Sequence, residues 1–173
     1  MRHIASLTFP SGASSGTVSF TSIPQIYQHL HLRMTVRGTQ TGSNNGWMWI
    51  KVNSNSTASS HYTMGNGSVY DSYRYISTTP NLMVMPRAGA ASNVFGIGIL
   101  DFLDYTSTSK NKTVKALSGY DANGNGGVMI SSLLATDTTA ITSIELIPWD
   151  MTAFAQYSRF DLYGLPSTTF TGA

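Results

Sequence analysis

The chain has 173 residues, a length typical of one domain, and it contains no cysteine, which excludes disulfide bonds and thiolate metal sites. Only 10% of the residues are charged, against roughly 25% in an ordinary soluble domain, so the surface must consist largely of serine, threonine, asparagine, glycine and tyrosine. The formal net charge of +2 is too small for an electrostatic nucleic-acid-binding face.

The N-terminal residues predict two short strands. Residues 4–9 alternate apolar and polar side chains, and residues 17–23 form a second short strand. Pro24 ends it, because a proline has no N–H to donate to a ladder. No apolar run has the length of a secretory h-region or a membrane span, so we expect a protein that is made in a cytoplasm.

Residues 29–37 carry the clearest periodic pattern in the chain. The apolar members stand at every second position: Leu30, Leu32, Met34 and Val36. A period of two predicts a strand with one buried and one wet face, and we expect this strand at the centre of a sheet.

Two histidines share the wet face of that strand. His29 and His31 stand two residues apart, a spacing that could offer two ligands to a metal, with a third from His3, His61 or a distant aspartate. The alternative is that they are solvated or hydrogen-bonded, and we expect this, with no metal and no cofactor.

A polar turn with an Asn-Gly pair, residues 39–46, leads into a predicted strand at 47–52. Trp47 and Trp49 fall on its wetter face, which is unexpected for such large apolar side chains. We expect a neighbouring loop or subunit to cover them; a sugar-stacking platform is the alternative.

The pattern weakens over residues 53–87, which predicts long loops with one or two short strands, at 73–76 and 82–85. Rigid aromatic rings among adaptable polar groups are typical of protein-binding loops. The region is therefore either a contact surface or an ordinary loop whose tyrosines cap the core. The candidate interface or ligand-contact residues of the chain are Trp47, Trp49, Tyr62, Tyr70, Tyr73 and Tyr75.

Strands return in the C-terminal half. Residues 93–103 are apolar on both parities, which predicts a strand covered on both faces. Residues 121–126 match half of a calcium loop but lack its closing acid, so we expect a Gly-rich hairpin turn. Residues 149–158 are either one helical turn or a loop. The other predicted strands lie at 113–119, 126–134, 141–148 and 159–165.

Eight to ten short strands and no convincing helix predict an all-β fold. We expect an antiparallel two-sheet sandwich, jelly-roll-like, because the jelly roll is the commonest closure at this length. The sandwich domain should span residues 1–165, followed by a polar C-terminal tail at 166–173.

Three stretches resemble a family of structural domains of tailed bacteriophages: FTSIPQIYQHLHLRMTVRG (20–38), ILDFLDYTSTSKNKTVKALSGYDANGNG (99–126) and AITSIELIPWDMTAFAQYSRFDLYGL (140–165). Such jelly-roll-like domains occur in tail-fibre and minor tail proteins and as free-standing virion proteins. The resemblance covers about half of the chain and implies a component of a virion that is assembled in the host bacterial cytoplasm. It implies no catalytic residues.

The sequence offers little enzymatic chemistry. Asp101 and Asp104 stand three residues apart on a strand and so point to opposite faces, and no Gly-x-Ser-x-Gly elbow occurs. We expect no enzyme.

Three functions are weighed: a capsid decoration (cement) subunit, a tail module that binds a host receptor or glycan, and a virion enzyme. We favour the first. Its expected partners are itself, as a homotrimer with the Trp47/Trp49 face or the Tyr62–Tyr75 loops in contact, and the major capsid protein or other virion proteins. A host surface glycan is an alternative partner; nucleic acid and membrane are not expected.

Overall fold

The structure, a computed structural model of the chain, describes residues 1–54, 58–66, 69–77 and 81–167. These residues contain strands and loops and no helix. The strands are β1 (Arg2–Thr8), β2 (Val18–Phe20), β3 (His29–Val36), β4 (Asn45–Val52), β5 (Ala58–Asn66), β6 (Val69–Ser77), β7 (Met83–Pro86), β8 (Gly96–Leu103), β9 (Lys112–Asp121), β10 (Gly126–Ala135), β11 (Ile144–Pro148) and β12 (Arg159–Leu165).

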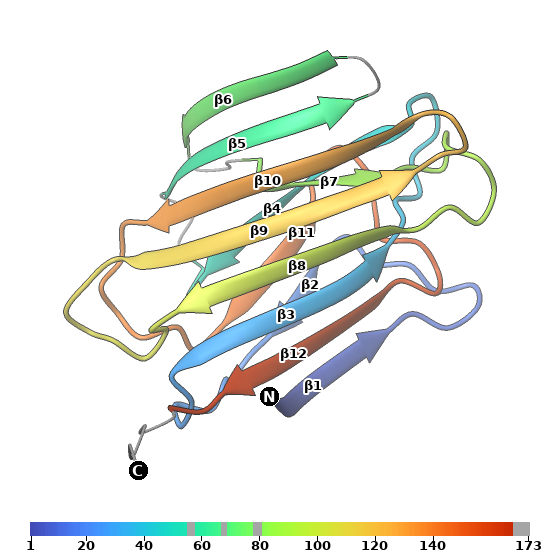
Figure 1. Cartoon of the computed structure of the whole chain (residues 1–173). Helices are drawn as coiled ribbons and strands as arrows, with labels where there is room; N and C mark the ends of the chain where they lie inside the picture. Colours follow the sequence, from blue (N-terminus) through green and yellow to red (C-terminus); the bar gives the residue numbers. More distant parts are fainter. Residues whose placement is uncertain (55–57, 67–68, 78–80, 168–173) are drawn as a thin grey trace, which may run out of the picture.

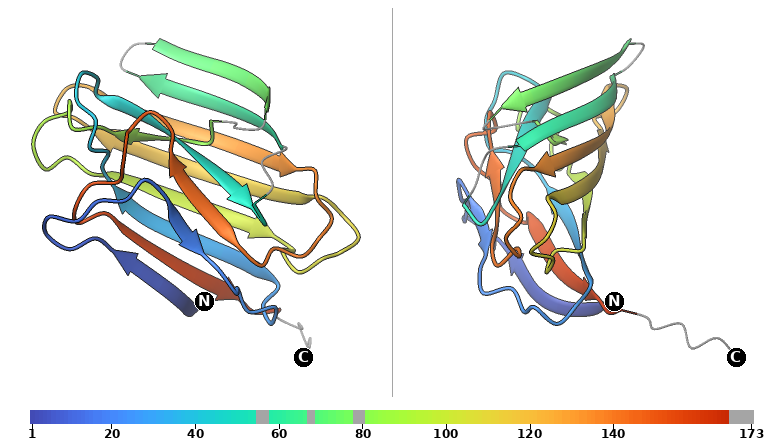
Figure 2. Two further views of the ribbon diagram at one scale, coloured as in Figure 1. Left: turned by 180° about the vertical axis from the view of Figure 1, so that it is seen from behind. Right: turned by 90° about the vertical axis from the view of Figure 1, so that its left-hand side faces the viewer.

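The strands form two antiparallel sheets of unequal size. The large sheet has eight strands in the order β1-β12-β3-β8-β9-β10-β5-β6, and the small sheet has four in the order β2-β11-β4-β7. The small sheet packs against one face of the large sheet and leaves the other face open (Figures 1 and 2). The predicted all-β antiparallel sandwich is therefore confirmed, with twelve strands where the sequence pattern predicts eight to ten.

β3 lies inside the large sheet, between β12 and β8, as the alternation of residues 29–37 predicts. Its four apolar side chains are buried, with exposed fractions between 0% and 3%, and the residues between them are half-buried or exposed. The predicted face of this strand is confirmed.

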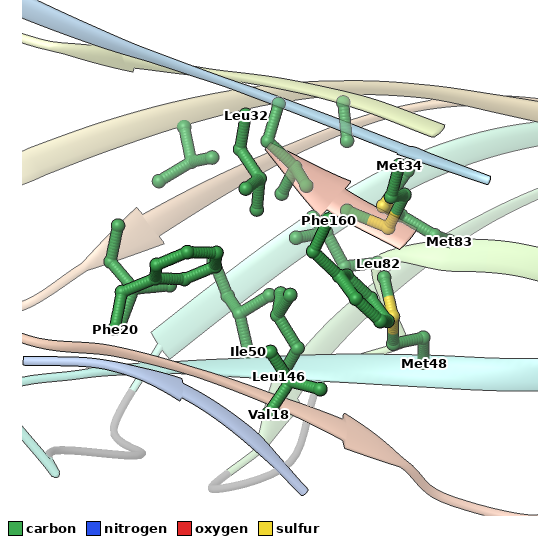
Figure 3. Close-up of a cluster of buried hydrophobic side chains, with 14 of the residues drawn as sticks. Val18, Phe20, Leu32, Met34, Met48, Ile50, Leu82, Met83, Leu146 and Phe160 are labelled. Carbon is green, nitrogen blue, oxygen red and sulfur yellow. The ribbon is translucent and has the colours of Figure 1, made fainter. Parts of the chain in front are cut away.

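The main core fills the space between the two sheets. Apolar side chains from β2, β4 and β11 meet side chains from β3, β8, β9 and β12 there (Figure 3). The largest fully buried apolar side chains are Tyr105, Phe102, Phe154, Phe160, Leu30, Leu32, Met48, Leu82, Met83, Met85 and Leu100. Each fully buried side chain of this size contributes about 1.5–3 kcal/mol relative to an exposed one, so this cluster is the main source of stability.

The expectation of long loops between residues 53 and 87 is wrong, whereas the two short strands expected at 73–76 and 82–85 coincide with parts of β6 and β7. The chain forms two nine-residue strands there, β5 and β6, which extend the large sheet beyond β10. β5 pairs with β10 over eight residue pairs, from Ala58↔Ala135 to Gly65↔Val128. A partner strand with unpaired backbone groups thus turns a weakly patterned, serine-rich segment into a strand.

β5 also protects the edge of the small sheet. β7 lies at that edge, and its four residues are all buried. Val84 on β7 belongs to a second apolar cluster with Tyr62 and Met64 from β5. Two buried hydroxyls of the large sheet bind the β7 segment: Ser118 Oγ accepts from Val84 N–H at 3.0 Å, and Ser131 Oγ donates to the Leu82 carbonyl. One N–H of this edge strand and one carbonyl beside it are thereby satisfied within the chain.

The chain covers β8 on one face only, so the predicted coverage on both faces is wrong for the chain by itself. Leu100 and Phe102 point into the core, whereas Ile97 and Leu103 on the opposite parity are 54% and 52% exposed.

Two predicted connections are resolved by the structure. The Gly-rich stretch at 121–126 is a hairpin turn between β9 and β10, as expected, with positive φ at Asn123 (62°) and Gly124 (95°). Residues 149–158 form a loop rather than a helical turn. Of the predicted tail, residues 168–173 lie outside the described residues.

Candidate functional site

Trp49 is covered by the chain itself. Its ring stacks on Trp149, with ring centroids 4.0 Å apart and an interplanar angle of 20°, and its Nε1–H donates to Asn81 Oδ1 at 3.0 Å. The exposed fraction of Trp49 is 9%, and that of Trp149 is 56%. Trp149 and Asn81 therefore provide the cover that was expected over Trp49. The ring of Trp149 is the one that is exposed to solvent.

Trp47, Tyr62 and Tyr73 form a row of aromatic rings from the small sheet to the end of the large sheet. The Trp47 and Tyr62 centroids are 5.7 Å apart, and those of Tyr62 and Tyr73 are 5.5 Å apart. Tyr62 is buried, Trp47 is half-buried and Tyr73 is 50% exposed. Such tilted pairs stabilise by about 0.5–1.5 kcal/mol each, so the first two rings hold β5 against β4.

The other two candidate tyrosines lie apart from this row. Tyr70 is 79% exposed and pairs with Gly65 of β5, which places its side chain on the opposite face of the sheet from Tyr73. Tyr75 pairs with Ser60 through the backbone, and its side chain lies outside the described residues.

His29 and His31 do not converge on one site. Each of them contacts a different aspartate residue. His31 Nδ1 lies 2.6 Å from Asp101 Oδ1, directly across the β3–β8 pair. His29 Nδ1 accepts the Asp104 N–H at 2.9 Å. Among the described residues, no group of three or more histidine, aspartate or glutamate side chains is arranged to hold a metal.

The outer face of the large sheet, which faces the viewer in Figure 1, carries a surface that the sequence analysis missed. Backbone register places its apolar side chains in two adjacent rows across β8, β9 and β10. We call these residues the apolar patch: Ile97, Ile99, Leu117, Val128 and Ile130. Four of the five are 44–57% exposed. The sequence does carry a signal for this surface. In residues 97–103 the positions that alternate with the core-facing ones are also mostly apolar, and apolar residues recur on the outer face at Leu117 and in β10.

A row of polar side chains crosses the same face beside the apolar patch. Register places His31, Asp101, Lys115, Ser132, His61 and Arg74 side by side on β3, β8, β9, β10, β5 and β6. We call this the polar row. Its carboxylate, Asp101, sits at the β8 end next to His31, and the β9–β6 end carries Lys115, Ser132, His61 and Arg74, none of which is acidic.

Two other carboxylates on or beside this face are paired with a cation. The guanidinium of Arg159 donates to both carboxylate oxygens of Asp161, at 2.8 Å each, and holds the pKa of Asp161 below its usual range. Near the end of β8, the Lys110 ammonium likewise lowers the pKa of Asp104. Asp121, at the end of β9, also lies on this face, and its carboxylate accepts the Asn123 N–H at 2.9 Å.

No family model, no curated protein and no solved structure matched this chain. Within the residues that the structure describes, no helix is long and apolar enough to cross a membrane.

Proposed function

We propose that this chain is a non-enzymatic structural protein of a bacteriophage particle and packs against neighbouring subunits through the outer face of its large sheet. The observation that carries the proposal is the apolar patch: four large aliphatic side chains about half exposed at the centre of an open sheet. Monomeric soluble proteins rarely expose contiguous apolar surface of this kind without a partner.

The size of the open face suits a protein contact. Eight strands spaced by roughly 4.8 Å, each about eight residues long at roughly 3.3 Å per residue, give an area of roughly 900 Å². A standard protein–protein interface takes about 800 Å² from each partner. The low charge content also supports the proposal, because charged residues are depleted at the centre of interfaces.

The resemblance of residues 20–38, 99–126 and 140–165 to phage structural domains supports the virion as the place of function. Within the virion we propose capsid decoration, with the chain as a homotrimer on the major capsid protein or another virion protein. A tail-fibre or minor tail module that binds a host receptor or glycan is the second candidate.

Quantitative mass spectrometry of purified particles tests the location. Decoration requires a copy number that scales with the capsid lattice, and labelling of the head in micrographs. A few copies at the tail tip would contradict decoration and favour the tail module. Absence from purified particles would contradict both. Sedimentation of the isolated chain and of the assembled form tests the trimer.

The contact surface predicts the effect of one substitution. Ile130→Asp should leave folding intact, because the side chain is 57% exposed, but should reduce incorporation into particles at least tenfold, because it puts a carboxylate in the apolar patch. The measurement is the amount of variant chain per particle, with thermal unfolding as the folding check. Ile26→Asp is the matched control, since Ile26 is 77% exposed and lies in the loop between β2 and β3, outside the apolar patch. Equal incorporation of both variants would contradict this contact surface.

A further inference from the structure

A hollow opens on the outer face of the large sheet between β9 and β6. Its floor consists of three short hydroxyl side chains, Ser132, Thr63 and Ser72, while longer side chains rise around them. The surrounding side chains are Lys115, His61, Arg74 and Ile130. The hollow exists because register sets short residues next to long ones: Ser132 lies between Lys115 and His61, and Thr63 lies between Ile130 and Ser72.

The two permanent charges at the hollow, on Lys115 and Arg74, are both positive. Lys115, His61 and Arg74 come from three different strands and stand in the polar row. No carboxylate lines the hollow. Asp101, the cross-strand neighbour of Lys115, is bound by His31, and Asp71 of β6 pairs with Met64, whose buried side chain lies on the opposite face of the sheet.

We propose that this hollow binds an anionic sugar. The ammonium of Lys115 holds its carboxylate or sulfate group, Arg74 adds positive charge at the far end of the hollow, and the floor hydroxyls exchange hydrogen bonds with the hydroxyls of the ring. The proposal goes beyond the structural role and does not rest on it: it concerns the isolated chain, since a subunit packed over the whole outer face would cover the hollow.

The chemistry of the floor favours a sugar over other anions. Serine and threonine hydroxyls both donate and accept, which matches the many hydroxyls of a sugar ring. An acidic peptide would need pockets for apolar side chains, and among the described side chains Ile130 is the only aliphatic one at the hollow. Nucleic acid would need a longer basic track than three side chains on a chain of net charge +2.

Affinity electrophoresis of the full chain tests the proposal, with four polymers in the gel. Polygalacturonate offers carboxylates and dextran sulfate offers sulfates. Neutral dextran is the control that has the sugar without the charge, and poly-L-glutamate is the control that has the charge without the sugar. We expect retardation by polygalacturonate or dextran sulfate, whichever group the hollow prefers, and none by dextran. If neither polygalacturonate nor dextran sulfate retards the chain, the proposal is overturned. If polyglutamate retards it as strongly as polygalacturonate does, the ligand is an acidic peptide and not a sugar.

Three variants separate a built site from a general positive charge. Lys115→Ser should weaken binding at least tenfold, whereas Arg33→Ser should change it less than threefold, because Arg33 is exposed on the same face but outside the hollow. Ser132→Leu keeps every charge and fills the floor, so it should also weaken binding at least tenfold. Equal losses for Lys115→Ser and Arg33→Ser, or full binding by Ser132→Leu, would overturn the site.

Discussion

Replacing Leu32 by aspartate is expected to abolish folding of the chain. Leu32 lies in the middle of β3, where its backbone pairs with Leu162 on one side and Leu100 on the other, and all three side chains are fully buried. An aspartate there would place a carboxylate in the core with no partner, which costs several kcal/mol. Since the whole stability of a domain is about 5–15 kcal/mol, the native state should not survive.

The measurement is the soluble yield of the variant, followed by circular dichroism and one-dimensional NMR. Thr35→Asp is the matched control, because Thr35 belongs to the same strand but faces outward and is exposed. Ile144→Asp should behave like Leu32→Asp, since Ile144 of β11 is fully buried on the facing sheet. Wild-type stability of either core variant would show that the assigned strand faces are wrong.

Replacing Lys112 by methionine should destabilise the fold by about 2–4 kcal/mol, because three partly buried carbonyl groups would lose their donor. Lys112 begins β9 and is only 1% exposed. Its ammonium donates to the carbonyls of Ser107, Lys110 and Thr138, at 2.6, 2.9 and 3.1 Å. Burial lowers the pKa of Lys112, so the charge is held at a cost that these hydrogen bonds offset. Methionine fills nearly the same volume and supplies no N–H.

Denaturant unfolding at neutral pH measures the effect. Lys115→Met is the matched control: Lys115 lies on the same strand at the exposed parity, so its loss should change the free energy of unfolding by less than about 0.5 kcal/mol. A Lys112→Met midpoint equal to that of the wild type would mean that the three carbonyls find other donors.

The effect is expected to be local to one end of the molecule. The three carbonyls belong to the loop between β8 and β9 and to the segment after β10, so the ammonium joins two connections that are far apart in sequence. Loss of the three hydrogen bonds from the Lys112 ammonium should therefore raise the amide exchange rates first at residues 104–112 and 136–140.

Local sequence pattern predicts the fold class and most of the strands. Alternation in residues 29–37 assigned Leu30, Leu32, Met34 and Val36 to the core, and the structure buries all four. The turn at 121–126 was equally readable, because positive φ at Asn123 and Gly124 requires residues that tolerate it. Both signals are local: a side chain's face depends on parity, and a turn depends on the few residues within it.

Long-range contacts account for β5, for most of β6 and for the surfaces that matter for function, since local pattern predicts only residues 73–76 of this hairpin as a strand. β5 forms because β10 offers it a backbone partner, which no pattern within residues 58–66 reveals. Trp49 is covered by Trp149, a hundred residues further along the chain, and the hollow draws Lys115, His61 and Arg74 from three strands. These features depend on strand order and register, which are set by long-range pairing and core packing rather than by local periodicity. The same long-range pairing decides that the apolar second face of β8 is left open by its own chain.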